Sequence, residues 1–101
     1  MSLFGRVSKL SSRLRDWSEL KEIISLQINT AKALGARPED IEIAQEYLRE
    51  GEYGLAWDQL VSQMYEYQIN IDQDYYDLVA EIAQKMRIGE NEYSFLREVI
   101  K

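Results

Sequence analysis

Apolar residues follow helical spacing through the first third of the chain. They recur at steps of three and four positions, with one step of seven before Ile24. Since each residue of an α-helix turns by about 100°, this spacing places them along one side of a single long helix. The residues of this stripe are Leu3, Val7, Leu10, Leu14, Trp17, Ile24, Ile28 and Ala31.

Isolated glycines and a single proline divide the rest of the chain into further helical segments. Gly35 is expected to end the first helix and Pro38 to begin the second, because the residue past a helix often needs a positive φ and proline suits the first turn. Gly51 then separates two segments that should form an antiparallel hairpin. The predicted helices span about residues 1–34, 38–50, 53–67, 73–86 and 91–100.

These segments predict one all-α domain over residues 1–101. No segment shows the sustained alternation of a strand, and a chain of 101 residues with 46% hydrophobic content can form one modest core. We expect a small bundle of about five helices, in which the long N-terminal helix packs on antiparallel helical hairpins. Asp16 followed by Glu19 resembles a capping box, so a break of the first helix near Arg15–Ser18 stays open.

Acidic residues are concentrated in the middle of the chain, in the helical region 38–86. Between Pro38 and Gln84, twelve acidic residues stand against one base, Arg49, so this stretch carries −11 while the remainder carries +5 and the whole chain −6. Strong helical patterning in the same stretch indicates a folded surface rather than a disordered acidic tail. A folded acidic surface attracts a basic partner.

Two groups of carboxylates fall on the outer sides of predicted helices. Three acids of the second helix and three of the fourth lie opposite the apolar sides of those helices. These candidate partner-binding residues are Glu39, Glu42, Glu46, Asp74, Asp77 and Glu81. The simpler interpretation is that every soluble helix has a charged outer side, but such sides normally mix both signs. The shortage of lysine and arginine favours a binding surface.

Apolar side chains near these carboxylates complete the predicted surface. Tyr65 and Tyr76 are proposed as aromatic anchors, because interfaces combine aromatic residues with a charged rim. Ile43 lies within the acidic side of the second helix, and Leu55 lies on the acidic side of the third. The alternative is that these residues are singly exposed or contact the first or the last helix.

The residue types that most enzymatic chemistry needs are absent. The chain has no His and no Cys, and its five glycines are isolated. The commonest general base, the thiolate nucleophile and the glycine-rich phosphate loop are therefore missing. Asp72 and Asp74 lack the spacing of a calcium-binding loop. We expect a protein that is not an enzyme and that has no catalytic residues, cofactor or metal.

The N-terminal segment is basic, with four bases and no acid before Asp16. The bases are Arg6, Lys9, Arg13 and Arg15. Such a segment is typical of a helix on a membrane surface, but a core-packed helix whose bases neutralise nearby acids is favoured. The net charge of −6 argues against phosphate contacts, and neither a bilayer-spanning run nor a signal peptide is present. We expect a cytoplasmic protein that binds neither nucleic acid nor membrane.

Several short sequence segments in the acidic region resemble those of a known family. The segment from Ala44 to Leu60 reads AQEYLREGEYGLAWDQL, and the pattern continues in Gln63–Tyr67, Tyr75–Asp77 and Ala83–Met86. Residues 41–96 resemble the MafI-type immunity proteins of bacterial polymorphic toxin systems, including small helical immunity proteins of contact-dependent growth inhibition. The Glu-Tyr-Gly-Leu-Ala turn also resembles the turns of tetratricopeptide-type hairpins.

The resemblance implies a small antidote that binds and neutralises a cognate toxin C-terminal domain, often a nuclease. A nuclease presents a basic cleft to its substrate, and an acidic surface is complementary to such a cleft. We therefore predict an immunity protein that inhibits a basic, RNA-cleaving toxin domain by tight binding. The alternative is a helical adaptor or scaffold that binds a basic peptide or protein.

Overall fold

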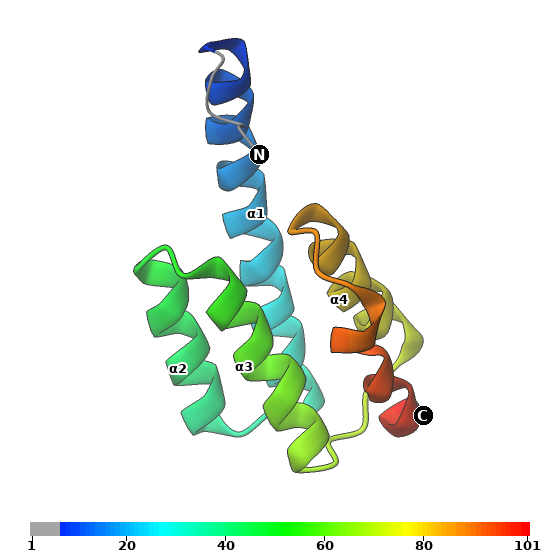
Figure 1. Cartoon of the computed structure of the whole chain (residues 1–101). Helices are drawn as coiled ribbons and strands as arrows, with labels where there is room; N and C mark the ends of the chain where they lie inside the picture. The colour runs from blue at the N-terminus through cyan, green and yellow to red at the C-terminus, as the bar shows by residue number, and fades with distance from the viewer. Residues whose placement is uncertain (1–6) are drawn as a thin grey trace.

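The structure, a computed structural model, describes the backbone of residues 7–101 and the side chains from Trp17 onward (Figure 1). Four α-helices form most of it, and two short 3-10 helices lie near the C-terminus. The elements are α1 (Val7–Leu34), α2 (Pro38–Arg49), α3 (Tyr53–Glu66), α4 (Gln73–Lys85), η2 (Glu90–Glu92) and η3 (Ser94–Val99). The prediction of a small all-α bundle is confirmed.

The long N-terminal helix α1 is continuous over 28 residues. It passes Arg15–Ser18 without interruption, so the break left open there does not occur. A capping side chain acts only where the chain leaves helical geometry, whereas an unbroken helix keeps adding one backbone hydrogen bond per residue. The first turns of α1 project past the other helices (Figure 1). The side chains of the predicted basic segment, up to Arg15, lie outside the described residues.

The second half of α1 forms the centre of the bundle. It packs against α2, α3 and α4 (Figure 1). Ile24, Ile28 and Ala31 are buried there, as their spacing predicts, and Leu20 is the first buried side chain among those described on α1. Trp17 belongs to the same predicted stripe, but its side chain is 48% exposed. Among the described side chains, burial on α1 therefore begins at Leu20, about one turn after Trp17.

All four α-helices end with the same pair of backbone hydrogen bonds. Just past each helix one residue has a positive φ, and its amide donates to the carbonyl three positions earlier. The amide of the following residue donates to the carbonyl five positions earlier. Glycine takes this left-handed position after α1 and α2, at Gly35 (φ 107°) and Gly51 (φ 77°), as predicted. After α3 and α4 it is taken by Gln68 (φ 51°) and Arg87 (φ 61°). Helix α4 ends at Lys85, within one residue of its predicted end at residue 86.

Helices α2 and α3 form the predicted antiparallel hairpin (Figure 1). The turn between them is closed by the amide of Glu52, which donates to the carbonyl of Tyr47 at 2.8 Å. Ile41, Ala44 and Leu48 are buried on the inner side of α2, as predicted. Their burial leaves the opposite side of α2, with its acidic residues, toward solvent.

The C-terminal segment is not the α-helix predicted for residues 91–100. It forms η2 and η3, both of the 3-10 type. Tyr93, Leu96 and Val99 are all buried, and their spacing matches the turn of about three residues of a 3-10 helix rather than the 3.6 or so of an α-helix. The chain end then pairs with the linker after α3, where the amide of Ile71 donates to the carbonyl of Val99 at 2.9 Å. This pairing anchors the last residues to the bundle.

Candidate protein-binding surface

The acidic side of α2 is exposed but partly neutralised within the chain. Glu39, Glu42 and Glu46 all face solvent. Glu39 forms an ion pair of 3.0 Å with Arg37, and Glu46 forms one of 3.1 Å with Arg49. Only Glu42 of this group lacks an ion pair within the described part of the chain. The α2 side therefore presents less uncompensated charge than the sequence indicates.

The acidic side of α4 carries less compensation. Asp74, Asp77 and Glu81 are exposed and lie opposite the buried side of α4. None of the three forms an ion pair with a described residue. Asp77 accepts a hydrogen bond of 2.8 Å from the side-chain amide of Gln73, which adds no charge. These three carboxylates are available to a basic partner.

The two acidic sides do not form one continuous site. Helices α1 and α3 lie between α2 and α4 (Figure 1), and the acidic side of each outer helix points away from the core. The six predicted carboxylates are thus divided between two separate surfaces. Helical spacing within each segment predicted the exposure of the carboxylates, but the arrangement of helices in space was not visible in it.

Tyr76 is not the exposed aromatic anchor that was predicted. It is 5% exposed, its ring lies against Tyr93 with centroids 5.7 Å apart, and the guanidinium of Arg97 lies 5.1 Å from the ring centroid. Burial raises the pKa of its hydroxyl, which has no hydrogen-bond partner in the structure. The C-terminal 3-10 segment covers this edge of α4, because Tyr93 and Arg97 fold back over it.

Tyr65 has a structural contact of its own. Its hydroxyl donates to the carboxylate of Glu98 at 2.9 Å, and its ring meets that of Phe95 edge-on with centroids 4.8 Å apart. The hydrogen bond to Glu98 raises the pKa of this tyrosine. Tyr65 is half-buried and joins α3 to η3. A role as a partner anchor would therefore use only the part of the ring that remains exposed.

Several large apolar side chains are exposed. Ile43 and Leu55, singled out in the sequence, are 41% and 48% exposed. Ile43 lies on the acidic side of α2. Tyr67 is also 48% exposed, and the guanidinium of Arg37 stacks 4.1 Å from its ring centroid. Single exposed apolar residues are common on soluble proteins, so none of these marks a site by itself.

Asp40 is a buried acid in the first turn of α2. It is 4% exposed, and its carboxylate accepts a hydrogen bond of 2.9 Å from Gln59 on α3. Arg37 approaches the other oxygen of Asp40 at 3.5 Å. The arrangement holds the start of α2 against α3, so both Asp40 and Arg37 serve the fold.

Gln27 is a buried polar residue at the centre of the bundle. Its side-chain nitrogen lies 3.4 Å from the carbonyl of Trp57 and 3.5 Å from the hydroxyl of Tyr75. Its side-chain oxygen has no hydrogen-bond partner in the structure. Gln27 follows Ile24 by three positions and precedes Ala31 by four, so helical spacing could have placed it on the buried side. Through its contacts with Trp57 and Tyr75, Gln27 connects α1 with α3 and α4.

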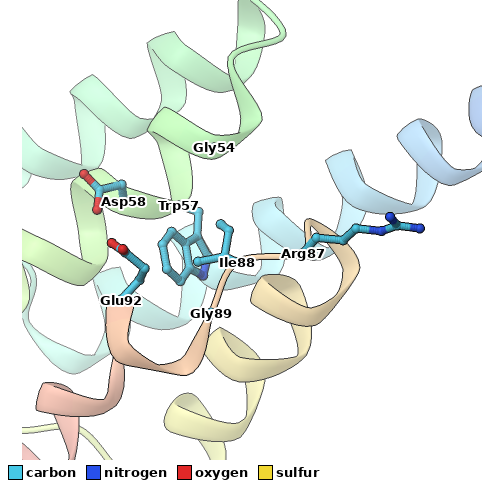
Figure 2. A pocket seen from close by; sticks show the side chains of 7 residues that line it. All are labelled: Gly54, Trp57, Asp58, Arg87, Ile88, Gly89 and Glu92. Carbon is cyan, nitrogen blue, oxygen red and sulfur yellow. The ribbon is translucent and has the colours of Figure 1, made fainter. Parts of the chain in front are cut away.

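The end of the bundle that carries the α2–α3 turn is hollowed by two neighbouring depressions. One, of about 440 Å³, lies between α1, the turn and the end of α4. The other, of about 360 Å³, lies between α3 and the segment after α4 (Figure 2). Gly54 lines both. We call them together the turn-end groove; its apolar lining residues are Trp17, Leu20, Tyr53, Trp57, Met86 and Ile88.

The charged residues of the turn-end groove are mainly acidic. Glu52, Asp58 and Glu92 are exposed, and none of them forms an ion pair with a described residue. Figure 2 shows Asp58 and Glu92 on the same side of the Trp57 ring, with the guanidinium of Arg87 directed away from them. The sequence patterns did not indicate this surface, because its residues come from three separate stretches of the chain, 17–20, 51–58 and 86–92.

No group of three acidic side chains in the described part is arranged to hold a metal ion, and none of the described helices has an apolar stretch that could cross a bilayer. No protein-family model, curated protein or solved structure matches the chain. The resemblance to immunity proteins therefore stays a prediction from the sequence.

Proposed function

We propose that this chain is a protein-binding domain that neutralises a basic toxin domain, as an immunity protein does. The observation that carries the proposal is the acidic side of α4, where Asp74, Asp77 and Glu81 are exposed without ion pairs to described residues. Like charges spaced three and four residues apart on a helix repel one another. A basic partner would relieve that repulsion on binding.

Charge acts mainly on the rate at which the two proteins meet. The chain carries a net charge of −6, with −11 concentrated between Pro38 and Gln84. Complementary charge can raise association by roughly 10²–10³-fold over a neutral pair at low salt. Fast association suits an antidote, because each toxin molecule must be captured before it reaches its substrate.

The toxin-directed form of the proposal comes from the resemblance of residues 41–96 to MafI-type immunity proteins. That range includes most of the α2–α3 hairpin, with the turn from Gly51 to Gly54, and all of α4. A nuclease with a basic cleft has the charge that the acidic sides of α2 and α4 would complement, and we propose an RNA-cleaving one. The proposed protein is bacterial and cytoplasmic, and it acts by binding rather than by catalysis.

A helical adaptor for a basic peptide is the second candidate. The antiparallel α2–α3 hairpin, packed on α1, resembles one unit of a tetratricopeptide-type array. The gene neighbourhood distinguishes the two candidates, because an immunity gene is expected directly downstream of a large secreted toxin gene.

Co-expression with the product of the adjacent upstream reading frame tests the immunity function. If that product arrests growth, we expect this chain to restore growth and to elute with it as one complex in gel filtration. A matched culture carrying the chain with Asp74→Lys and Asp77→Lys should be protected less well at equal expression. Unrelieved growth arrest together with separate elution would contradict the immunity function and leave the adaptor.

A further inference from the structure

We infer that the turn-end groove is the docking site for a segment of the basic partner in which an apolar side chain lies next to a lysine or arginine. This inference rests on the proposed function, since it gives the basic partner a defined point of attachment. The groove lies at the end of the bundle that carries the α2–α3 turn, and none of its lining residues was among the predicted binding residues.

The apolar lining of the groove fits a hydrophobic side chain. Trp17, Tyr53 and Met86 line the larger depression, and none of the three is fully buried. Trp57 and Ile88 line the smaller one beside them. An aliphatic or aromatic side chain placed there would remove apolar surface from water on both partners, which is the main source of affinity at the centre of protein interfaces.

Gly54 keeps the two depressions open toward each other. Its φ is not in the left-handed region, and a Cβ atom added to it would meet no described atom within 4 Å. Neither backbone geometry nor packing within the described part of the chain therefore requires glycine at this position. Glycine is also a poorer helix former than almost any other residue. A bound segment that approaches the start of α3 closely would explain why the position lacks a side chain.

The charges beside the groove decide the kind of partner. Glu52, Asp58 and Glu92 are exposed and have no ion pair with a described residue. Arg87 is the basic residue that lines the groove, and its side chain points away from Asp58 and Glu92 in Figure 2. A lysine or arginine adjacent to the docked apolar side chain would lie near the two carboxylates, whereas an acidic segment would be repelled.

A defined peptide tests the groove without knowledge of the natural partner. The probe is a fluorescein-labelled peptide of about 14 residues, roughly four helical turns, built from leucine and lysine at helical spacing. Binding to the intact chain is followed by fluorescence anisotropy. We expect Gly54→Leu to weaken binding by about tenfold or more. The leucine fills the groove without changing charge, so the apolar side chain of the peptide loses its contacts there. The matched control Gln84→Leu, exposed on α4 outside the groove, should bind within about twofold of wild type.

A pair of charge reversals separates the groove from the acidic side of α4. One double variant carries Asp58→Lys with Glu92→Lys, and the other carries Asp74→Lys with Asp77→Lys. Both change the net charge equally, so a difference in peptide affinity between them reports where on the surface the charge acts. We expect the first pair to weaken peptide binding by about tenfold more than the second. Thermal unfolding followed by circular dichroism checks that each variant remains folded. Equal binding by wild type and Gly54→Leu, or a greater loss from the α4 pair, would overturn the inference.

The two proposals fail in different ways. A toxin that binds wild type and Gly54→Leu equally would overturn the docking site and leave the immunity function intact. Binding of the peptide in the groove, without capture of the upstream gene product, would support the groove and contradict the immunity function.

Discussion

The indole nitrogen of Trp57 on α3 donates a hydrogen bond of 3.2 Å to the backbone carbonyl of Val79 on α4. Trp57 is 2% exposed, and its ring meets that of Tyr93 at nearly a right angle with centroids 6.3 Å apart. The Trp57 side chain thus joins α3 to α4 and to the C-terminal segment. It also forms part of the floor of the turn-end groove, so the groove is built on one of the most constrained points of the core.

Replacing Trp57 with Phe should destabilise the protein by about 2 kcal/mol. The change removes the hydrogen bond to Val79 and leaves unfilled volume beside Tyr93. Urea unfolding followed by circular dichroism measures the effect. The variant Leu26→Ala, at a side chain that is 53% exposed, is the control and should change stability by less than about 0.5 kcal/mol. Equal effects of the two substitutions would contradict the central place given to Trp57.

Gln68→Gly should stabilise the protein by about 1 kcal/mol. Gln68 holds a left-handed conformation with φ of 51° after α3, and a non-glycine residue is strained there by roughly 1–2 kcal/mol, part of which the extra flexibility of glycine in the unfolded chain offsets. The free energy of unfolding from urea titration reports the change.

The control for that substitution is a glycine placed inside a helix. Gln45→Gly lies on the exposed side of α2 and should lower stability by about 0.5–1 kcal/mol. If both substitutions destabilise the protein to the same extent, the helix-ending geometry at Gln68 is not strained.

Tyr76→Phe should leave stability unchanged or raise it by up to about 1 kcal/mol. The hydroxyl of Tyr76 is buried without a hydrogen-bond partner among the described residues, and its removal ends that desolvation penalty while the ring keeps its contacts with Tyr93 and Arg97. Tyr65→Phe, which loses the hydrogen bond to Glu98, should instead cost roughly 0.5–1 kcal/mol. Thermal melts of the two variants compare them directly, and a marked loss at Tyr76 would show that its hydroxyl has a partner in solution.

Much of the fold could be predicted from the sequence, because the helices follow local spacing and local stop signals. The stripe from Ile24 to Ala31 is buried, and Gly35 and Gly51 have the positive φ that glycine permits. The ends of α3 and α4 lie within one residue of their predicted positions, but the left-handed geometry past them was not predicted, since Gln68 and Arg87 hold it without glycine. The residues that follow them, Ile69 and Ile88, pack against the core.

The candidate site was less predictable, because it depends on which segments meet. Exposure of the six acidic residues followed from helical spacing, but their division between two surfaces depends on α1 and α3 lying between α2 and α4 (Figure 1). The burial of Tyr76 depends on a C-terminal segment that folds back as a 3-10 helix. The turn-end groove joins Trp17 to Glu92, residues too far apart in sequence for any local pattern to connect.

Charge reversal at Asp74 and Asp77 should slow association with the upstream gene product without unfolding the chain. Both side chains are exposed and make no ion pair with a described residue, so lysine should cost the fold less than about 0.5 kcal/mol. We expect the association rate constant to fall by about tenfold at low salt. Stopped-flow fluorescence measures it, and Asp74→Asn with Asp77→Asn should give an intermediate rate.

The most direct test of the account is calorimetric titration of this chain with the upstream gene product at a low and a high salt concentration. We predict nanomolar affinity that weakens as salt increases, because screening reduces the attraction between an acidic protein and a basic one. Tight binding that does not change with salt would contradict the role given to the acidic surface. No binding at either salt concentration would contradict the proposed immunity function.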